Sequence, residues 1–192
     1  MGGFGYMKKH IISITGDLAS GKTTVTKMIA DELNFKIYKN GEYFRKLALE
    51  HNMNVTEFNK YVEEHPEIDR QIELSATKYA EENDNFIIDA RLGWYSVPES
   101  FKIYLKVDID ESARRAFGDE SRKATENFAT VEEYKQDLLK RYTLENDRYF
   151  KLYGVKKNDM NNYDLIVDTT NITPEEVKNI IIENYNEWLK NI

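Results

Sequence analysis

A glycine-rich segment directly after an apolar run places the strongest constraint on the fold of this chain. The run HIISIT, residues 10–15, carries isoleucine on consecutive positions, as expected for a strand buried on both faces. Gly16, Gly21, Lys22 and Thr23 follow and complete the pattern G-x-x-x-x-G-K-[ST]. Apolar residues then recur at helical spacing, at Val25, Met28, Ile29 and Leu33. This order of strand, turn and helix predicts a phosphate-binding loop rather than a chance match.

The chemistry of such a loop assigns roles to its residues. Its glycines let backbone N–H groups turn toward phosphate oxygens, and the following helix presents its positive N-terminal end. We predict that Lys22 reaches the terminal phosphates of ATP and that the Thr23 hydroxyl holds Mg²⁺. Asp17 puts a negative charge beside a polyanion, so we expect its side chain to point away. The candidate ATP-binding residues are Gly16, Ala19, Ser20, Gly21, Lys22, Thr23 and Thr24.

Four further apolar segments predict strands that alternate with helices. They are residues 35–38, 86–89, 101–107 and 164–168. Capping-box spacing marks the helix starts, at Asp108 with Glu111, Thr130 with Glu133 and Thr173 with Glu176. The pattern predicts an α/β fold, a doubly wound five-stranded parallel sheet with helices on both faces. Ligands of such sheets bind at the carboxyl ends of the strands.

Composition narrows the class of protein. The chain has 192 residues, 41% of them hydrophobic, and a formal net charge of −7, which argues against non-specific nucleic-acid binding. It has no cysteine, which fits a reducing cytosol, and no apolar run long enough to cross a bilayer. We therefore expect a cytoplasmic protein with a small-molecule partner, without nucleic acid or membrane. We expect residues 1–8 to be an N-terminal extension, either a cloning remnant or a frayed end, and residues 9–192 to be a single domain.

Charged residues after the second and third strands predict an acceptor site. Arg45 lies on the helix that follows the second strand, Asp89 ends the third strand, and Arg91 lies just beyond it. Charged side chains at this partly buried edge of the sheet cost free energy unless an opposite charge or a hydrogen-bonding group compensates them there. Asp89 can hold a Mg²⁺-bound water or a substrate hydroxyl, and Arg91 can clamp a phosphate. The alternatives are an ion pair between Asp89 and Arg91 and a solvated Arg45.

The segment 114–130 begins as a helix and continues as a polar stretch. We predict a mobile lid over about residues 117–130, because this stretch offers few anchors to a core. Arg115 and Arg122 are candidates to close over the transferring phosphoryl group. The alternative for each arginine is a solvated, charged helix end.

A later helix carries two more arginines. Arg141 and Arg148 are seven residues apart and share one helix face, and Glu145 lies four residues after Arg141. Arg141 is a further candidate for contact with phosphate. Ordinary salt bridges along the helix are the alternative for both arginines.

The order of these motifs resembles the short, archaeal-type cytidylate kinases, a branch of the nucleoside monophosphate kinases. The resemblance runs from His10 to Val177. It lies in the glycine-rich loop and in the segments NGEYFRKLA, HPEIDRQI, DARLGW, RYFKLYGV and NYDLIVDTTNITPEEV. It implies a P-loop kinase fold with a mobile lid. It also implies transfer of the γ-phosphoryl group of ATP to CMP or dCMP in the presence of Mg²⁺.

The resemblance also implies roles for single residues. Arg45 and Arg91 match arginines that hold the phosphate of the acceptor, and the segment DTTN, residues 168–171, lies where the family packs adenine. Asp89 joins these arginines as an acceptor-binding candidate. The candidate catalytic residues are Lys22, Arg115, Arg122 and Arg141.

The chain departs from the longer cytidylate kinases at the base-reading side. Those enzymes have an acid-glycine-arginine-acid stretch after the third strand, where this chain has Ala90 and Leu92 in place of the glycine and the second acid. His65 and Asp69 are candidates to read a base or ribose, the alternative being a capping role ahead of Pro66. The other functions that remain open are a kinase for dephospho-coenzyme A or a deoxynucleoside, and a nucleotide-binding regulator without turnover.

Overall fold

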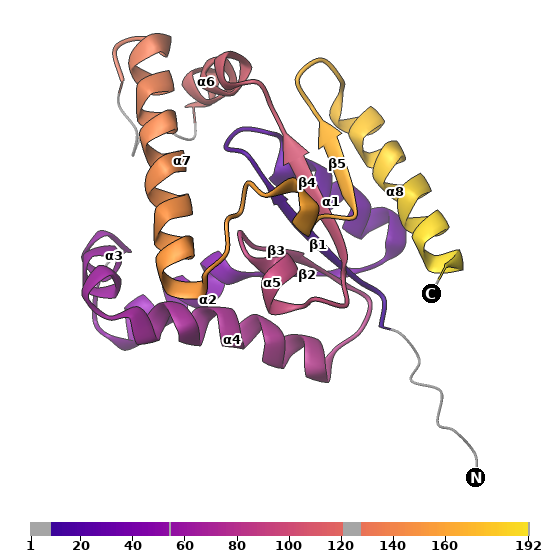
Figure 1. Cartoon of the computed structure of the whole chain (residues 1–192), viewed down its shortest axis with the longest axis horizontal. Helices are drawn as coiled ribbons and strands as arrows, with labels where there is room; N and C mark the ends of the chain where they lie inside the picture. The colour runs from indigo at the N-terminus through magenta and orange to yellow at the C-terminus, as the bar shows by residue number, and fades with distance from the viewer. Residues whose placement is uncertain (1–8, 54, 121–127, 192) are drawn as a thin grey trace.

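The computed structural model describes residues 9–53, 55–120 and 128–191 (Figure 1). Five strands form one sheet in the order β2-β3-β1-β4-β5, and every neighbouring pair is parallel. Each strand begins and ends within one residue of its predicted segment. The prediction of a five-stranded, parallel α/β sheet is confirmed. The strands are β1 (Ile11–Gly16), β2 (Lys36–Lys39), β3 (Phe86–Asp89), β4 (Phe101–Lys106) and β5 (Leu165–Asp168).

The helices begin where the sequence marks their caps. The side chains of Asp108, Thr130 and Thr173 each accept a hydrogen bond from a backbone N–H in the first helical turn. Thr173 and Glu176 complete a reciprocal capping box, which stabilises the start of the last helix. The helices are α1 (Lys22–Leu33), α2 (Asn40–Glu50), α3 (Val55–Glu64), α4 (Pro66–Glu82), α5 (Gly93–Ser96), α6 (Ile109–Gly118), α7 (Val131–Tyr153) and α8 (Pro174–Lys190), with a 3-10 turn, η2, at Met160–Asn162.

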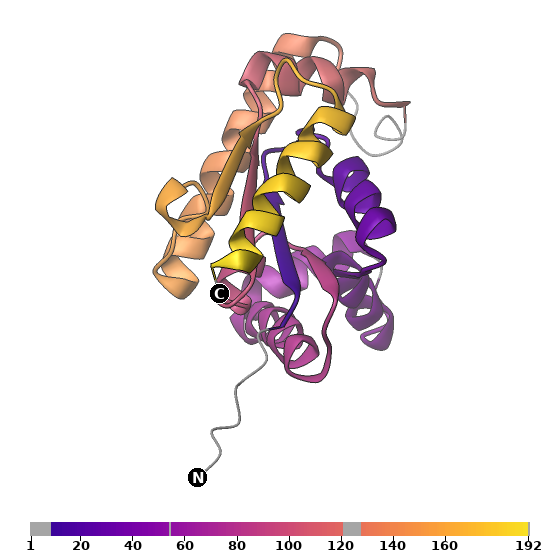
Figure 2. The same cartoon turned by 90° about the vertical axis from the view of Figure 1, so that its right-hand side faces the viewer.

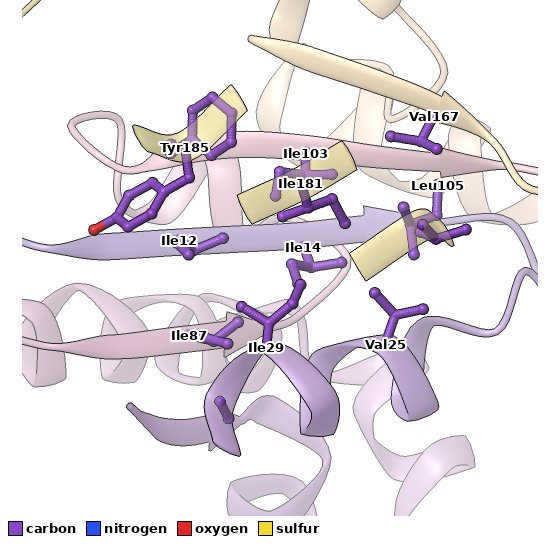
Figure 3. Packing of buried hydrophobic residues seen from close by; sticks show 13 residues of the cluster. Ile12, Ile14, Val25, Ile29, Ile87, Ile103, Leu105, Val167, Ile181 and Tyr185 are labelled. Carbon is purple, nitrogen blue, oxygen red and sulfur yellow. The ribbon is translucent and has the colours of Figure 1, made fainter. Parts of the chain in front are cut away.

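The central strand β1 is buried on both of its faces. Ile12 and Ile14 pack against α1 and α8 in the largest apolar cluster, which Figure 3 shows. Ile11 points to the opposite face and packs with Phe86 and Ile88 of β3, beneath α4 and α5. Figure 2 shows α1 and α7 on opposite sides of the sheet. Burial on both sides explains why the residues of this run are apolar at consecutive positions.

Because all the strands run in parallel, their carboxyl ends meet at one edge of the sheet. Asp89 pairs with Ile14 of β1 and with Lys39 of β2, so β2 and β3 end within two residues of the level at which the glycine-rich loop begins. Arg91 follows two residues after Asp89 at this edge. The register therefore brings the loop and the candidate acceptor residues together.

Part of the predicted lid lies outside the described residues. α6 ends at Gly118, and Phe128 stacks on Tyr134 of α7 with ring centroids 4.5 Å apart. Residues 121–127, which include Arg122, are not described, so the lid stays a prediction. In the part of the chain that is described, no helix has both the length and the apolar character needed to cross a bilayer.

Candidate functional site

A cavity of about 850 Å³ lies at the carboxyl edge of the sheet. The glycine-rich loop, residues 16–24, lines one part of it. The remaining walls come from the end of β2 and the start of α2, from α4, from the end of β3, from α6 and α7, and from Lys157. The volume lies in the upper part of the usual range for small-molecule sites, about 300–1,000 Å³.

Two glycines of the loop occupy positions that other residues could not take without strain. A Cβ atom on Gly16 would lie 2.8 Å from the backbone oxygen of Leu105. Gly21 has a φ of +83°, in the left-handed region that favours glycine. The pattern G-x-x-x-x-G-K-[ST] is therefore a requirement of the backbone here: Gly16 permits close contact with β4, and Gly21 turns the chain into α1.

The loop also leaves hydrogen-bonding groups without protein partners. Among the described residues, the backbone N–H groups of Leu18, Ala19 and Gly21 donate to no backbone acceptor. The Ser20 hydroxyl is buried and has no hydrogen-bond partner. A buried hydroxyl needs a hydrogen-bond partner, and N–H groups that the protein leaves unpaired in such a loop suit phosphate oxygens.

The side chain of Asp17 is held away from the loop, as expected. One carboxylate oxygen accepts from the Tyr104 hydroxyl, and the other accepts from the backbone N–H of Val107 at 3.0 Å. Burial and the adjacent carboxylate raise the pKa of Tyr104 above its usual range. Asp17 therefore fastens the loop to β4 rather than facing a bound phosphate.

Lys22 and Asp89 form an ion pair inside the cavity. Burial, followed by repulsion from Arg91, Lys157 and Lys39, lowers the pKa of Lys22 to about 8, while the negative charge of Glu145 opposes the shift. Lys22 is therefore a cation in a crowded positive field. Phosphate oxygens entering the loop would relieve this repulsion.

Arg91 pairs with Glu145 of α7 and not with Asp89, so the ion pair considered as an alternative from the sequence does not form. The other oxygen of Glu145 accepts from Lys157 Nζ at 2.9 Å, and Lys157 is only 4% exposed. Although burial opposes it, the two cations hold the pKa of Glu145 below its usual value. Sequence reasoning missed Lys157, which follows α7 in an irregular segment where no periodic pattern marks it.

Two further arginines line the same cavity. Arg45 is exposed and has no hydrogen-bond or ion-pair partner among the described residues. Arg148 Nη2 lies 2.8 Å from an Asp69 carboxylate oxygen, so it joins α7 to α4 rather than bridging along its own helix. Burial raises the pKa of Asp69, although Arg148 opposes the shift. Arg45 and Arg91 thus face one space with the glycine-rich loop, as the sequence analysis anticipated.

Arg115 lies beside the loop but is bound to the protein itself. Its Nη2 donates to the backbone oxygens of Thr169 and Thr170, at 2.8 and 3.0 Å, and its Nε donates to Glu111 at 2.9 Å. The guanidinium therefore ties α6 to the segment DTTN after β5. Arg115 therefore lies near the loop, but its guanidinium is already bound to oxygen atoms of the protein.

The structure does not bring Arg141 or His65 into the main cavity. Arg141 lies 3.4 Å from Asp137 and lines a second cavity of about 240 Å³ between the loop, α6 and α7. His65 precedes Pro66 as the N-cap residue of α4, without a side-chain cap bond. Its ring stacks on Tyr61 at 3.7 Å.

Glu73 and its partners form a polar group that sequence reasoning missed. Glu73 accepts from the Ser96 hydroxyl at 2.6 Å and from Asn40 Nδ2 at 3.4 Å. Burial raises the pKa of Glu73. One signal was available: Asp69 and Glu73 are four residues apart and therefore share one face of α4.

The loop offers oxygen ligands for a metal ion only in company with a nucleotide. Mg²⁺ usually takes one or two protein oxygens together with waters and phosphates. The Thr23 hydroxyl and the Asp89 carboxylate, which both line the cavity, supply such oxygens. Among the described residues, no group of three or more His, Cys, Asp or Glu side chains could hold a metal by itself.

A family model and several curated relatives identify one family. The family model described as "Cytidylate kinase-like family" matches residues 11–171. A cytidylate kinase of Pyrococcus horikoshii is 36% identical over 174 residues, which cover 90% of this chain and 86% of that protein. A cytidylate kinase of Archaeoglobus fulgidus is 33% identical over 173 residues, 90% of this chain and 92% of that protein.

Solved structures share the fold at low identity. An uncharacterized protein from Eubacterium ventriosum has a TM-score of 0.69 at 18% identity, over 93% of this chain and 99% of that chain. A shikimate kinase from Bacteroides thetaiotaomicron has a TM-score of 0.61 at 16% identity, over 91% of this chain and 97% of that chain. At such identities these structures show the fold alone.

Proposed function

This chain belongs to the cytidylate kinase-like family, and from that premise we propose that it is a nucleoside monophosphate kinase that transfers the γ-phosphoryl group of ATP to CMP or dCMP. One observation carries the proposal. The phosphate-binding loop and the cations Arg45 and Arg91 line a single cavity, although they come from separate elements. A site that receives two phosphate-bearing substrates needs two such groups of donors in one space.

ATP binds with its phosphates in the glycine-rich loop. The unpaired N–H groups of Leu18, Ala19 and Gly21 bind phosphate oxygens there. Lys22 leaves Asp89 and turns to the terminal phosphates, where its charge is better compensated. Adenine packs against residues 168–171, a segment whose position Arg115 fixes.

The acceptor binds with its phosphate between Arg45 and Arg91. Arg91 gives up its ion pair with Glu145 and binds two oxygens of the phosphate. Glu145 stays paired with Lys157. The planar guanidinium suits two oxygens of one phosphate. An acceptor without a phosphate would leave Arg45 without a partner and give Arg91 no reason to leave Glu145.

Catalysis then consists of positioning and charge neutralisation, without a covalent intermediate. The acceptor phosphate oxygen forms a bond to the γ-phosphorus as the bond from that phosphorus to the β-phosphate oxygen breaks, giving ADP and a nucleoside diphosphate. Lys22 and Arg91 hold the two phosphates in line. Thr23 and Asp89 would hold Mg²⁺, which supplies neutralisation of the transferring charge when bound. Arg122, in the proposed lid, would add positive charge around the closed site.

A panel of acceptors tests this function. ADP release is measured with ATP and Mg²⁺ in the presence of each nucleoside monophosphate, each deoxynucleoside monophosphate, dephospho-coenzyme A and deoxycytidine. We expect release that depends strictly on CMP or dCMP. ADP release only with dephospho-coenzyme A or only with deoxycytidine would show that this compound, and not CMP or dCMP, is the acceptor. Nucleotide binding without ADP release under any condition would show that the protein is a regulator without turnover.

A further inference from the structure

The acceptor part of the cavity contains a polar pair between apolar walls. Glu73 of α4 and Asn40 of α2 both line the cavity. Phe44 follows Asn40 by one helical turn, and Ile72 directly precedes Glu73, and both line the same space. Flat aromatic and aliphatic surfaces of this kind suit the faces of a nucleobase.

Glu73 and Asn40 together have more hydrogen-bond acceptor atoms than the protein supplies donors for. Glu73 receives a strong bond at one oxygen, from Ser96 Oγ at 2.6 Å, but only a long one of 3.4 Å at the other, from Asn40. Because a carboxylate only accepts, the amide nitrogen of Asn40 is the atom that faces it. Asn40 Oδ1 is then buried without a hydrogen-bond partner among the described residues. Buried acceptors without donors are rare, and here they occur in a ligand cavity.

Neighbouring residues do not offer the same capacity. The Asp69 carboxylate, one turn before Glu73, is already paired with Arg148. Leu92, which stands where longer cytidylate kinases have an acid, is 0% exposed and packs with Trp94 and Tyr149. Glu73 on α4 therefore has acceptor capacity that neither of these neighbouring positions offers.

We propose that Glu73 and Asn40 select the acceptor by accepting hydrogen bonds from an exocyclic amino group on its base. This inference rests on the proposed function and adds a physical reason why the enzyme would select one base over another. The amino group of cytosine carries two hydrogens, one for Glu73 and one for Asn40 Oδ1. The oxo group of uracil carries none and would face two acceptor oxygens, so uracil is rejected.

The test compares CMP with UMP in wild-type protein and in Glu73→Gln, which keeps the size of the side chain and adds an amide donor. We expect the ratio of kcat/KM for CMP to that for UMP to fall at least about tenfold, because glutamine can donate to the oxo group. The KM for ATP should not change. Glu67→Gln, at an exposed position in the first turn of α4, is the matched control and should keep the wild-type ratio.

A second variant covers the case in which Glu73→Gln does not fold. Asn40→Ala removes the unpaired oxygen at the start of α2 and should lower the same ratio severalfold. Thermal melting of each variant reports folding. A ratio that stays at the wild-type value in whichever of the two variants folds overturns this inference and leaves the kinase function standing.

A different result would show that the proposed kinase function is wrong. The wild-type protein would then release no ADP with any nucleoside monophosphate. In that case calorimetric titration of CMP and UMP, without ATP, decides the inference by itself. Tighter binding of CMP that is lost in Glu73→Gln supports it, and equal affinities for CMP and UMP in the wild-type protein contradict it.

Discussion

The two parts of the cavity are built in different ways. The part proposed to bind ATP is one contiguous segment, residues 16–24, and it offers backbone N–H groups whose positions follow from the turn between β1 and α1. The part proposed to bind the acceptor collects side chains from α2, α4, α7 and the end of β3. Its cations Arg91 and Arg148 are paired with carboxylates from other helices. The first is therefore determined by local backbone geometry, and the second by the packing of distant elements.

This difference implies that the two parts can change independently. A substitution in α4 or α7 can alter which acceptor binds without moving the loop between β1 and α1. A substitution in the loop removes the donor nucleotide and leaves the acceptor site in place. The predictions below test this independence in order of decreasing effect.

The largest effect is expected at the loop. Lys22→Ala should abolish turnover, a loss on the order of 10³-fold, because no other group reaches the terminal phosphates from the loop. Its melting temperature should stay within about 4 °C of the wild type, because Lys22 is a ligand contact and not a core residue. Lys27→Ala, an exposed position on the same helix, is the control for both measurements. Near-normal turnover in folded Lys22→Ala would contradict the kinase mechanism.

Arg91→Ala should have the next largest effect and act only on the acceptor. Loss of a charge-assisted contact should raise the KM for CMP roughly ten- to a hundredfold, with the KM for ATP nearly unchanged. Arg91→Lys should restore the KM only in part, because an ammonium cannot bind two phosphate oxygens as a planar guanidinium does. Arg114→Ala, which removes an exposed arginine paired with Glu111, serves as the control. If Arg91→Ala instead raises the KM for ATP, Arg91 belongs to the ATP site and our placement of the acceptor is wrong.

The pH dependence of ATP binding should show the state of Lys22. Its pKa of about 8 in the free protein means that the lysine loses its charge as the pH rises above that value. Bound phosphates favour the charged form and raise this pKa, so the affinity for ATP should be constant below pH 8 and fall by up to about tenfold per pH unit above it. Calorimetry at pH 7, 8 and 9 measures the fall, which Lys22→Ala should lack. A constant affinity up to pH 9 would disagree with the lowered pKa.

The smallest effect is expected at a helix cap that does not line the cavity. Thr173→Ala removes the capping box at the start of α8 and should lower the free energy of unfolding by about 1 kcal/mol. For a domain of this size the melting temperature should fall by about 2–4 °C. Both KM values should remain at the wild-type level, since α8 packs on α1 and β5 and not on the cavity. A change in either KM would show that stability and site geometry are coupled.

The sequence predicted the parts of the site that depend on local chemistry. The loop was found from two glycines, Lys22 and Thr23, because backbone geometry demands those residues at that spacing. The strands β1, β3 and β4 were predicted because their burial in the sheet favours apolar residues at consecutive positions. Arg91 was predicted because it follows directly after a buried strand; it lines the cavity, and its contact with the acceptor stays a prediction.

The remaining site residues could not be predicted in the same way. Lys157 is buried by contacts that only the folded chain provides, and nothing near it in the sequence marks it. Arg148 looks like a helix salt-bridge residue, but its partner Asp69 is 79 residues away in the chain. Asn40 and Glu73 lie on different helices, so their hydrogen bond depends on how α2 packs against α4. Pairings over such distances follow from tertiary packing, which periodicity does not report.

Separate titrations of ATP and CMP test the central claim, the independence of the two parts, most directly. Calorimetry is performed with each ligand on wild-type protein, Lys22→Ala and Arg91→Ala. The account predicts a crossed result: Lys22→Ala loses affinity for ATP and retains it for CMP, whereas Arg91→Ala weakens CMP roughly ten- to a hundredfold and retains ATP. If both variants lose both ligands to a similar extent, the cavity is a single site and the account of two independent parts is wrong.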